Sequence, residues 1–157
     1  MHSCYFVLIP KNEAKNEEKA RTQAMTILEN EQFFYGEGGY FSSGKGDWGV
    51  VGGRWTGLLT GKEYEINDKK TKNYRSTYIT GGYKNDAMIL SQKILDILAK
   101  NRPNTDFDGK KLKGTWNYLD TEVFDVDIPE EFTVKDLIKN KKDYLGKYWI
   151  VVIDYHS

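Results

Sequence analysis

The chain has 157 residues, and its 23 Lys and Arg residues balance 23 Asp and Glu residues, so the formal net charge is zero. This balance excludes a protein that holds nucleic acid or an anionic membrane by overall positive charge, although a local basic patch stays open. Cys4 is the only cysteine, which excludes an internal disulfide and argues against a cysteine-based zinc site. No stretch approaches the roughly 20 apolar residues of a membrane span. We expect one cytoplasmic domain, residues 1–157, without a cofactor.

The N-terminal part of the chain predicts a strand followed by a helix. Residues 3–9 form a β-branched and aromatic run, which predicts a central strand that Pro10 ends. Apolar residues recur at helical spacing over residues 13–30, which predicts a helix with Asn12 as its N-cap.

The next part predicts a loop, a β-hairpin and an insertion. Residues 31–46 form an aromatic, Gly-rich loop that we expect to fold over a core edge or a cleft. Strands over 47–51 and 54–59 would be joined by Gly52-Gly53 as a two-residue turn, because such turns need positive φ. Residues 61–76 show no sustained period and predict a solvated, mobile insertion.

The remaining predicted elements are a short strand over 77–80, a helix over 85–101 capped by Asn85 or Asp86, strands over 112–119 and 122–128, a short helix that starts from a capping box at Thr133, and a buried strand over 147–155. The order fits a ferredoxin-like β-α-β-β-α-β plan, with an antiparallel sheet and helices on one face, plus extra C-terminal strands and a short helix. We therefore predict an α+β fold in which the first strand is central and the closing strand lies beside it.

One stretch, residues 46–57, differs from the rest of the chain because it holds two of the four Trp residues and five Gly. Arg54 could hold a phosphate or carboxylate in bidentate fashion, Trp48 and Trp55 could stack on a flat group, and Asp47 could orient the arginine or accept from a ligand. The alternative is a structural hairpin, in which the Trp side chains fill the core and Arg54 pairs with Asp47 across the strands.

Residues 47–57 also resemble the core motif of a set of small uncharacterised phage and bacterial proteins, D-W-x-V-[VI]-G-G-R-W-x-G, which follows an N-terminal strand like residues 4–9. The resemblance implies a phage or mobile-element accessory protein of the anti-defence type, and it implies no particular activity. The chain departs from the pattern at Gly49, where an aromatic or polar residue is common, and it lacks longer central insertions.

A second Gly-Gly pair, Gly81-Gly82, precedes the predicted helix over 85–101. Such a turn can bind an anion through free N–H groups and the helix dipole, and its alternative is an ordinary strand-to-helix turn. If both Gly-Gly turns lie on one side of the sheet, Arg54 and Lys84 would converge on a pocket for a nucleotide or another phosphate.

Three further groups of charged or metal-ligating residues have a functional and an ordinary interpretation. If the first and last strands pair antiparallel, His2, Cys4, Asp154 and His156 would meet at one end of the sheet. The four could then hold a metal, and the alternative is ordinary polar termini. Asp125 and Asp127 would share a strand face and could bind a divalent ion, or simply face solvent. Two basic clusters lie beside aromatic residues and are most simply solvated surface: Lys69, Lys70, Lys72 and Arg75 beside Tyr74, and Lys110, Lys111 and Lys113 beside Trp116.

The sequence favours a non-enzymatic binding protein that takes a nucleotide-like phosphate ligand or a host protein through the Trp/Arg hairpin. One alternative is a metal-assisted phosphoester or nucleotide hydrolase that uses Asp47, Asp125, Asp127 or the terminal group. The other is a protein-binding scaffold that uses the aromatic loop, residues 33–41. We expect neither bulk nucleic-acid binding nor membrane binding, and a homodimer stays open.

Overall fold

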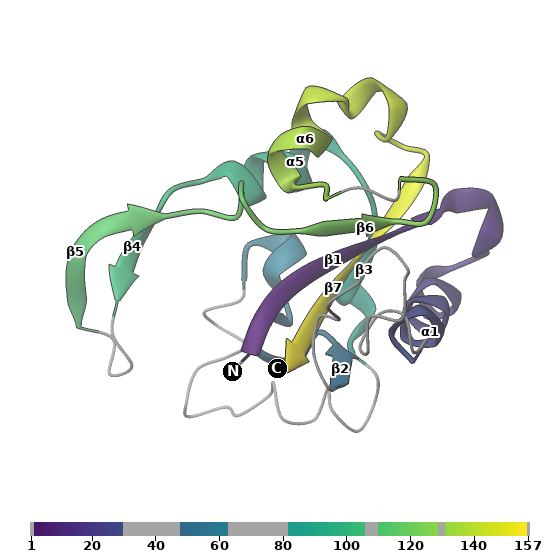
Figure 1. Ribbon diagram of the computed structural model, residues 1–157, viewed down its shortest axis with the longest axis horizontal. Helices are drawn as coiled ribbons and strands as arrows, with labels where there is room; N and C mark the ends of the chain where they lie inside the picture. Colours follow the sequence, from purple (N-terminus) through teal and green to yellow (C-terminus); the bar gives the residue numbers. More distant parts are fainter. Residues whose placement is uncertain (1, 30–47, 63–81, 106–109, 129–130, 157) are drawn as a thin grey trace.

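A computed structural model describes residues 2–29, 48–62, 82–105, 110–128 and 131–156 (Figure 1). In chain order the elements are β1 (His2–Pro10), the 3-10 helix η1 (Lys11–Glu13), α1 (Glu17–Leu28), β2 (Trp48–Val51), η2 (Gly53–Trp55), η3 (Leu58–Thr60), η4 (Lys84–Asp86), β3 (Ala87–Ile89), α5 (Gln92–Ala99), β4 (Arg102–Thr105), β5 (Lys111–Trp116), β6 (Val123–Asp125), α6 (Val134–Lys139), η5 (Lys141–Asp143) and β7 (Tyr148–His156). The predicted α+β class is confirmed.

The two outermost strands of the sequence supply the middle of the main sheet. β1 and β7 pair antiparallel over nine residue pairs, beginning with His2 opposite His156. Both strands are apolar at nearly every central position. This is expected of a strand whose two faces are both covered, because neither face is exposed to water. The central first strand and its closing neighbour are therefore confirmed, and the sheet order is β2-β7-β1-β6, with β3 also on β7.

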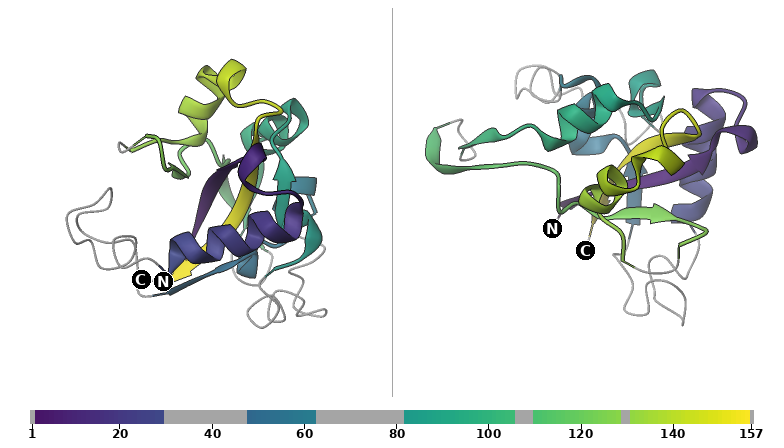
Figure 2. Two further views of the ribbon diagram at one scale, coloured as in Figure 1. Left: turned by 90° about the vertical axis from the view of Figure 1, so that its right-hand side faces the viewer. Right: turned by 90° about the horizontal axis from the view of Figure 1, so that it is seen from above.

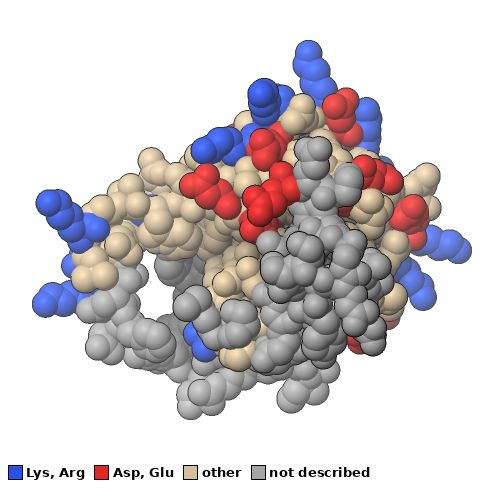
Figure 3. Space-filling view, viewed as in Figure 1, with Lys and Arg blue, Asp and Glu red and all other residues tan. Residues whose placement is uncertain are grey.

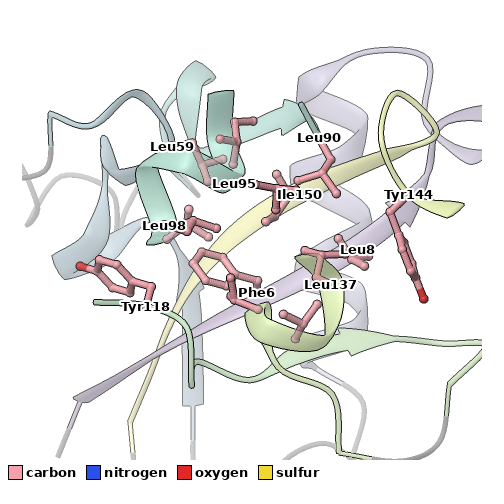
Figure 4. Close-up of a cluster of buried hydrophobic side chains, with 14 of the residues drawn as sticks. Phe6, Leu8, Leu59, Leu90, Leu95, Leu98, Tyr118, Leu137, Tyr144 and Ile150 are labelled. Carbon is pink, nitrogen blue, oxygen red and sulfur yellow. The ribbon is translucent and has the colours of Figure 1, made fainter. Parts of the chain in front are cut away.

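Helices cover both faces of this sheet, which corrects the prediction of helices on one face only. Side chains of β1 alternate between the faces, and both sets are apolar, so each face needs a cover. On one face, α1 brings Ala20, Ala24 and Leu28 against Tyr5 and Val7; Figure 2 shows this helix lying along the sheet. On the other face, the core contains residues of η3, α5 and α6 packed on β1 and β7, among them Leu59, Leu95, Leu98, Leu137, Phe6, Leu8 and Ile150 (Figure 4).

The sheet is mixed, so the antiparallel ferredoxin-like plan is wrong in this respect. β6 pairs parallel to β1, with Val7 opposite Phe124. Only three residues of the predicted strand over 122–128 belong to β6, since the chain turns at 126–127. A parallel neighbour is not visible in the order of elements, because it depends on which edge of β1 the chain returns to.

β2 and β3 together form one interrupted edge strand. Both pair antiparallel with β7, β2 through residues 48–51 and β3 through residues 87–89. Between them, the Gly52 N–H donates to the Val152 carbonyl at 2.8 Å and continues the ladder. Residues 52–86 are therefore an excursion that leaves the edge of the sheet and returns to the same line.

This edge contradicts two predicted elements. β2 pairs with β7, and residues 54–59 lie in the turns η2 and η3, so the predicted hairpin around Gly52-Gly53 is wrong. The predicted helix over 85–101 begins only at Gln92, because residues 87–89 pair with β7 and Ser91 accepts from the Ile94 N–H as the N-cap. Pairing with the central strand outweighs the helical spacing of this apolar run.

Two other helix starts are governed by caps. Asn16, rather than Asn12, accepts from the Lys19 N–H at 2.9 Å, so α1 begins at Glu17. Thr133 and Asp136 form the predicted capping box of α6.

β4 and β5 form a separate two-stranded sheet that extends away from the body (Figures 1 and 2). β4 was not predicted as a strand, and it pairs Arg102 with Trp116 and Thr105 with Lys111 of β5. The aromatic loop over 31–46, the strand over 77–80 and nearly all of the insertion over 61–76 lie outside the described residues. Within the described part of the chain, no helix has the length and apolar character needed to cross a membrane.

Candidate functional site

The sheet end where both termini lie brings together two groups of candidate residues that the sequence treats separately. His156 of β7 lies between His2 of β1 and Trp48 of β2, and Asp154 lies between Cys4 and Val50. Because strand side chains alternate, His2, Cys4, Asp154 and His156 share one sheet face. The expected meeting of the four terminal residues is confirmed by this register.

Asp154 holds this end together through both of its carboxylate oxygens. It is fully buried. Its Oδ1 lies 2.7 Å from Nδ1 of His2, and its Oδ2 accepts from the backbone N–H of Arg54 at 2.9 Å. Since an ionised carboxylate only accepts hydrogen bonds, Nδ1 of His2 is the donor, and the imidazole is held in one orientation. The Asp154 carboxylate therefore binds both the ring of His2 and the backbone of Arg54.

The second histidine packs against the first. The rings of His2 and His156 are 5.2 Å apart, centroid to centroid, with an interplanar angle of 75°. This edge-to-face contact places two imidazoles beside the start of η2, which carries the exposed side chain of Arg54. The site thus places the backbone of Arg54 and the ring of His2 on one buried carboxylate, with the ring of His156 packed against that of His2.

Gly52 and Gly53 make this arrangement sterically feasible. A Cβ on Gly53 would lie 2.4 Å from Oδ2 of Asp154, and a Cβ on Gly52 would lie 2.4 Å from Oδ2 of Asp86. Both residues also have positive φ, 55° and 79°. The two glycines are required because a buried carboxylate approaches each of them, and not because they form a hairpin turn.

Asp86 links the start and the end of the excursion over residues 52–86. The sequence predicts it only as a candidate helix cap. Its carboxylate accepts from the Thr56 hydroxyl at 2.7 Å, the Gly57 N–H at 3.0 Å and the Tyr83 N–H at 2.9 Å. These bonds join the two ends of residues 52–86. Only the Tyr83 contact is local, and no local pattern marks Asp86 for this role because its other two partners, Thr56 and Gly57, lie 30 and 29 residues away in sequence.

The pH dependence of stability should carry a signature of Asp86. Burial raises the pKa of Asp86 above its ordinary value of 3.8, against the hydrogen bonds and the charge of Arg21, which lower it. The folded state then holds this proton more tightly than the unfolded state, so the contribution is present below 3.8 and is lost as the pH rises through the folded value. We expect urea denaturation to show the free energy of unfolding falling relative to Asp86→Asn as the pH rises from 3.8 towards neutrality. An Asp120→Asn control should show no such trend, and a pH-independent difference for Asp86→Asn would contradict the assignment.

The other predicted ligand-binding residues are less connected to this site. Trp55 is half-buried and packs against the core, as the structural interpretation expects. Lys84 lies exposed in η4, and its convergence with Arg54 stays a prediction. Asp47 and the side chain of Trp48 lie outside the described residues, so pairing of Asp47 with Arg54 is also untested.

The acidic pair predicted to share a strand face does not do so. β6 ends at Asp125, which is buried, while Asp127 follows in an exposed turn and donates its N–H to the Asp125 carboxylate at 3.0 Å. Burial and the carboxylate of Asp125, to which its hydroxyl donates, raise the pKa of Tyr144. The described residues contain no group of three or more His, Cys, Asp or Glu side chains arranged to hold a metal, and this includes the four terminal residues.

Comparison of the chain with family models, with curated proteins and with solved structures finds no match. The resemblance of residues 47–57 to the phage and bacterial motif therefore stays a prediction, and the functional argument rests on the geometry at the sheet end.

Proposed function

We propose that this chain is a non-enzymatic binding protein that takes a phosphate-bearing, nucleotide-like ligand at the sheet end formed by His2, Arg54 and His156. The observation that carries the proposal is the double use of Asp154. One buried carboxylate orients the His2 ring and anchors the backbone of Arg54. Guanidinium and imidazole groups are the usual donors to phosphate oxygens, and donors fixed in advance lose less entropy on binding.

Asp154 does not line the surface that a phosphate would meet. Its two oxygens already accept from protein donors, and the side chain has no exposed surface. The exposed guanidinium of Arg54 is the group that a phosphate would meet first. A phage or mobile-element accessory of the anti-defence type, as residues 47–57 suggest, would use such a site to sequester a nucleotide signal or to contact a host protein.

The alternatives have less support among the described residues. A metal-assisted hydrolase needs a ligand group, and Asp125 is directed inward while Asp127 is exposed in a turn. The scaffold that uses residues 33–41 falls outside the described residues and stays a prediction. Binding to a host protein through the sheet end remains the second version of the proposal.

The test is a calorimetric titration and thermal-shift series with inorganic phosphate, adenosine monophosphate, adenosine triphosphate and a cyclic oligonucleotide. We expect at least one phosphate ligand to bind. Arg54→Ala should weaken it roughly 10- to 100-fold, because one charge-assisted hydrogen bond is lost at about 1.5–3 kcal/mol. The fold should persist, since alanine keeps the N–H that Asp154 accepts from.

Lys139→Ala is the matched control, because it removes one exposed positive charge from α6 at a different part of the molecule. It should bind as the unchanged protein does. If no phosphate ligand binds, or if Arg54→Ala binds as tightly as Lys139→Ala, the ligand proposal is wrong, and the host-protein version becomes the one to test.

A further inference from the structure

The hydrogen bond between His2 and Asp154 decides which nitrogen of the His2 ring a ligand can meet. Nδ1 of His2 lies 2.7 Å from Oδ1 of Asp154, and Asp154 is fully buried. The side chain of His2 itself is 19% exposed. Because Nδ1 is directed at a buried carboxylate, Nε2 is the ring nitrogen that a ligand at the sheet end would contact.

The same hydrogen bond decides what Nε2 of His2 offers to a ligand. A neutral imidazole carries one N–H proton, and here that proton is on Nδ1, which donates to Asp154. Nε2 of the neutral ring is therefore an acceptor, and it would set its lone pair against a phosphate oxygen. Only the imidazolium, with a proton on each nitrogen, can donate to Asp154 and to a phosphate at the same time.

We propose that the sheet end binds its phosphate ligand together with a proton, which Nε2 of His2 takes up. This inference rests on the proposed function and adds a regulation to it, because ligand affinity then depends on pH. A bound phosphate stabilises the imidazolium, so the ring in the complex keeps its second proton to a higher pH than the ring in the free protein. Affinity is therefore highest at low pH and falls as the pH rises through the range of about 5 to 8 in which imidazoles ordinarily titrate.

The charges around His2 are compatible with a protonated ring. Among the described residues that the strand register and the hydrogen bonds place at this end, the other titratable or charged ones are Cys4, Arg54, Asp154 and His156. The Asp154 carboxylate touches the ring and offsets the charge of the imidazolium. A second imidazolium on His156, whose ring centre lies 5.2 Å away, would be opposed by the first, so we assign the proton to His2 alone.

The acidic side chains in view lie mostly away from the sheet end. Figure 3 shows most of them over the upper part of the body, whereas Figure 1, drawn from the same side, places both chain ends at the bottom. The carboxylate at the sheet end itself, Asp154, is buried and accepts hydrogen bonds at both oxygens. On this face, the groups that would repel an anion are therefore mostly remote from His2.

The test repeats the calorimetric titrations with the same four phosphate ligands between about pH 5.5 and 8, on the unchanged chain and on His2→Gln. Glutamine keeps a neutral N–H donor on a side chain of similar length and does not titrate. From the lowest to the highest pH, the affinity of the unchanged chain should fall about tenfold or more relative to that of His2→Gln. The comparison between the two proteins cancels the titration of the phosphate ligand itself.

Titrations at about pH 7 in two buffers of different ionisation enthalpy count the protons directly. The unchanged chain should take up as much as about one proton more per bound ligand than His2→Gln does. His156→Gln is the comparison for the second imidazole, and it should bind more weakly at every pH while keeping the pH dependence. If His2→Gln does not fold, the buffer titrations of the unchanged chain decide the question.

Nitrogen NMR of the ligand-free chain gives a second readout, in which the neutral His2 ring should carry its proton on Nδ1. A neutral ring protonated on Nε2 would overturn the proposal without any ligand. Parallel pH profiles for the unchanged chain and His2→Gln, with a ligand that both bind, would also overturn it and would leave the proposed function standing. Absence of binding by the unchanged chain at every pH would overturn both.

Discussion

Replacing Asp154 by alanine is expected to lower the free energy of unfolding by about 3 kcal/mol and to abolish phosphate-ligand binding at the sheet end. The substitution removes the acceptor from Nδ1 of His2 and from the N–H of Arg54 in one step. Each donor is then left facing a space closed to water, since Asp154 is fully buried. Urea denaturation followed by circular dichroism gives the stability, and calorimetry gives the binding.

Asp120→Ala is the control for Asp154→Ala, because the Asp120 side chain is 89% exposed and its contact with Lys135 is a surface ion pair. We expect this control to change stability by less than about 0.5 kcal/mol. Asp154→Asn should fall between the two, since it keeps one acceptor oxygen. A His2→Ala/Asp154→Ala cycle should show coupling of about 1 kcal/mol or more. Additive single effects would mean that the His2–Asp154 contact does not stabilise this end of the sheet.

Replacing Gly53 by alanine is expected to be as damaging, for a steric reason. Its new Cβ would lie 2.4 Å from Oδ2 and 2.5 Å from Cβ of Asp154, so the side chain that anchors Arg54 has to move. We expect a loss of about 3 kcal/mol or more, together with weaker phosphate binding. Chemical denaturation and calorimetry on the same sample measure both effects.

Gly146→Ala separates this clash from backbone strain. Gly146 has a φ of 74°, against 55° for Gly53, and a Cβ built there meets nothing within 4 Å. This control should cost only about 1 kcal/mol, which is the usual price of a left-handed non-glycine residue. If Gly53→Ala costs no more than Gly146→Ala, the approach of Asp154 is not what requires glycine at position 53.

The sequence predicts well those elements that are encoded by a continuous pattern within one segment. β1 and β7 were predicted because each is a continuous β-branched and aromatic run, and α6 because Thr133 and Asp136 form a local capping box. These signals lie within the segment itself. The expected meeting of His2, Cys4, Asp154 and His156 followed directly from pairing the two strands.

What the sequence does not predict depends on partners that are distant in the chain. Residues 87–89 share the apolar spacing of the helix that follows, and only pairing with β7 makes them a strand. In the sequence, Gly52-Gly53 looks like a hairpin turn. In the structure, glycine is needed at both positions because the carboxylates of Asp86 and Asp154 approach them closely. The two groups of candidate site residues stayed separate in the sequence because the contact between Arg54 and Asp154 spans 100 positions.

The pairing of β1 with β7 has a consequence for how the chain is made. While the chain is being synthesised, β1 emerges early, but its antiparallel neighbour is not available until residues 148–156 have left the ribosome. Until then an apolar strand has an open edge, which is the kind of surface that promotes aggregation. Contacts of such large sequence separation also slow folding. Loss of residues 148–156 would thus leave β1, β2 and β3 without the strand they all pair with.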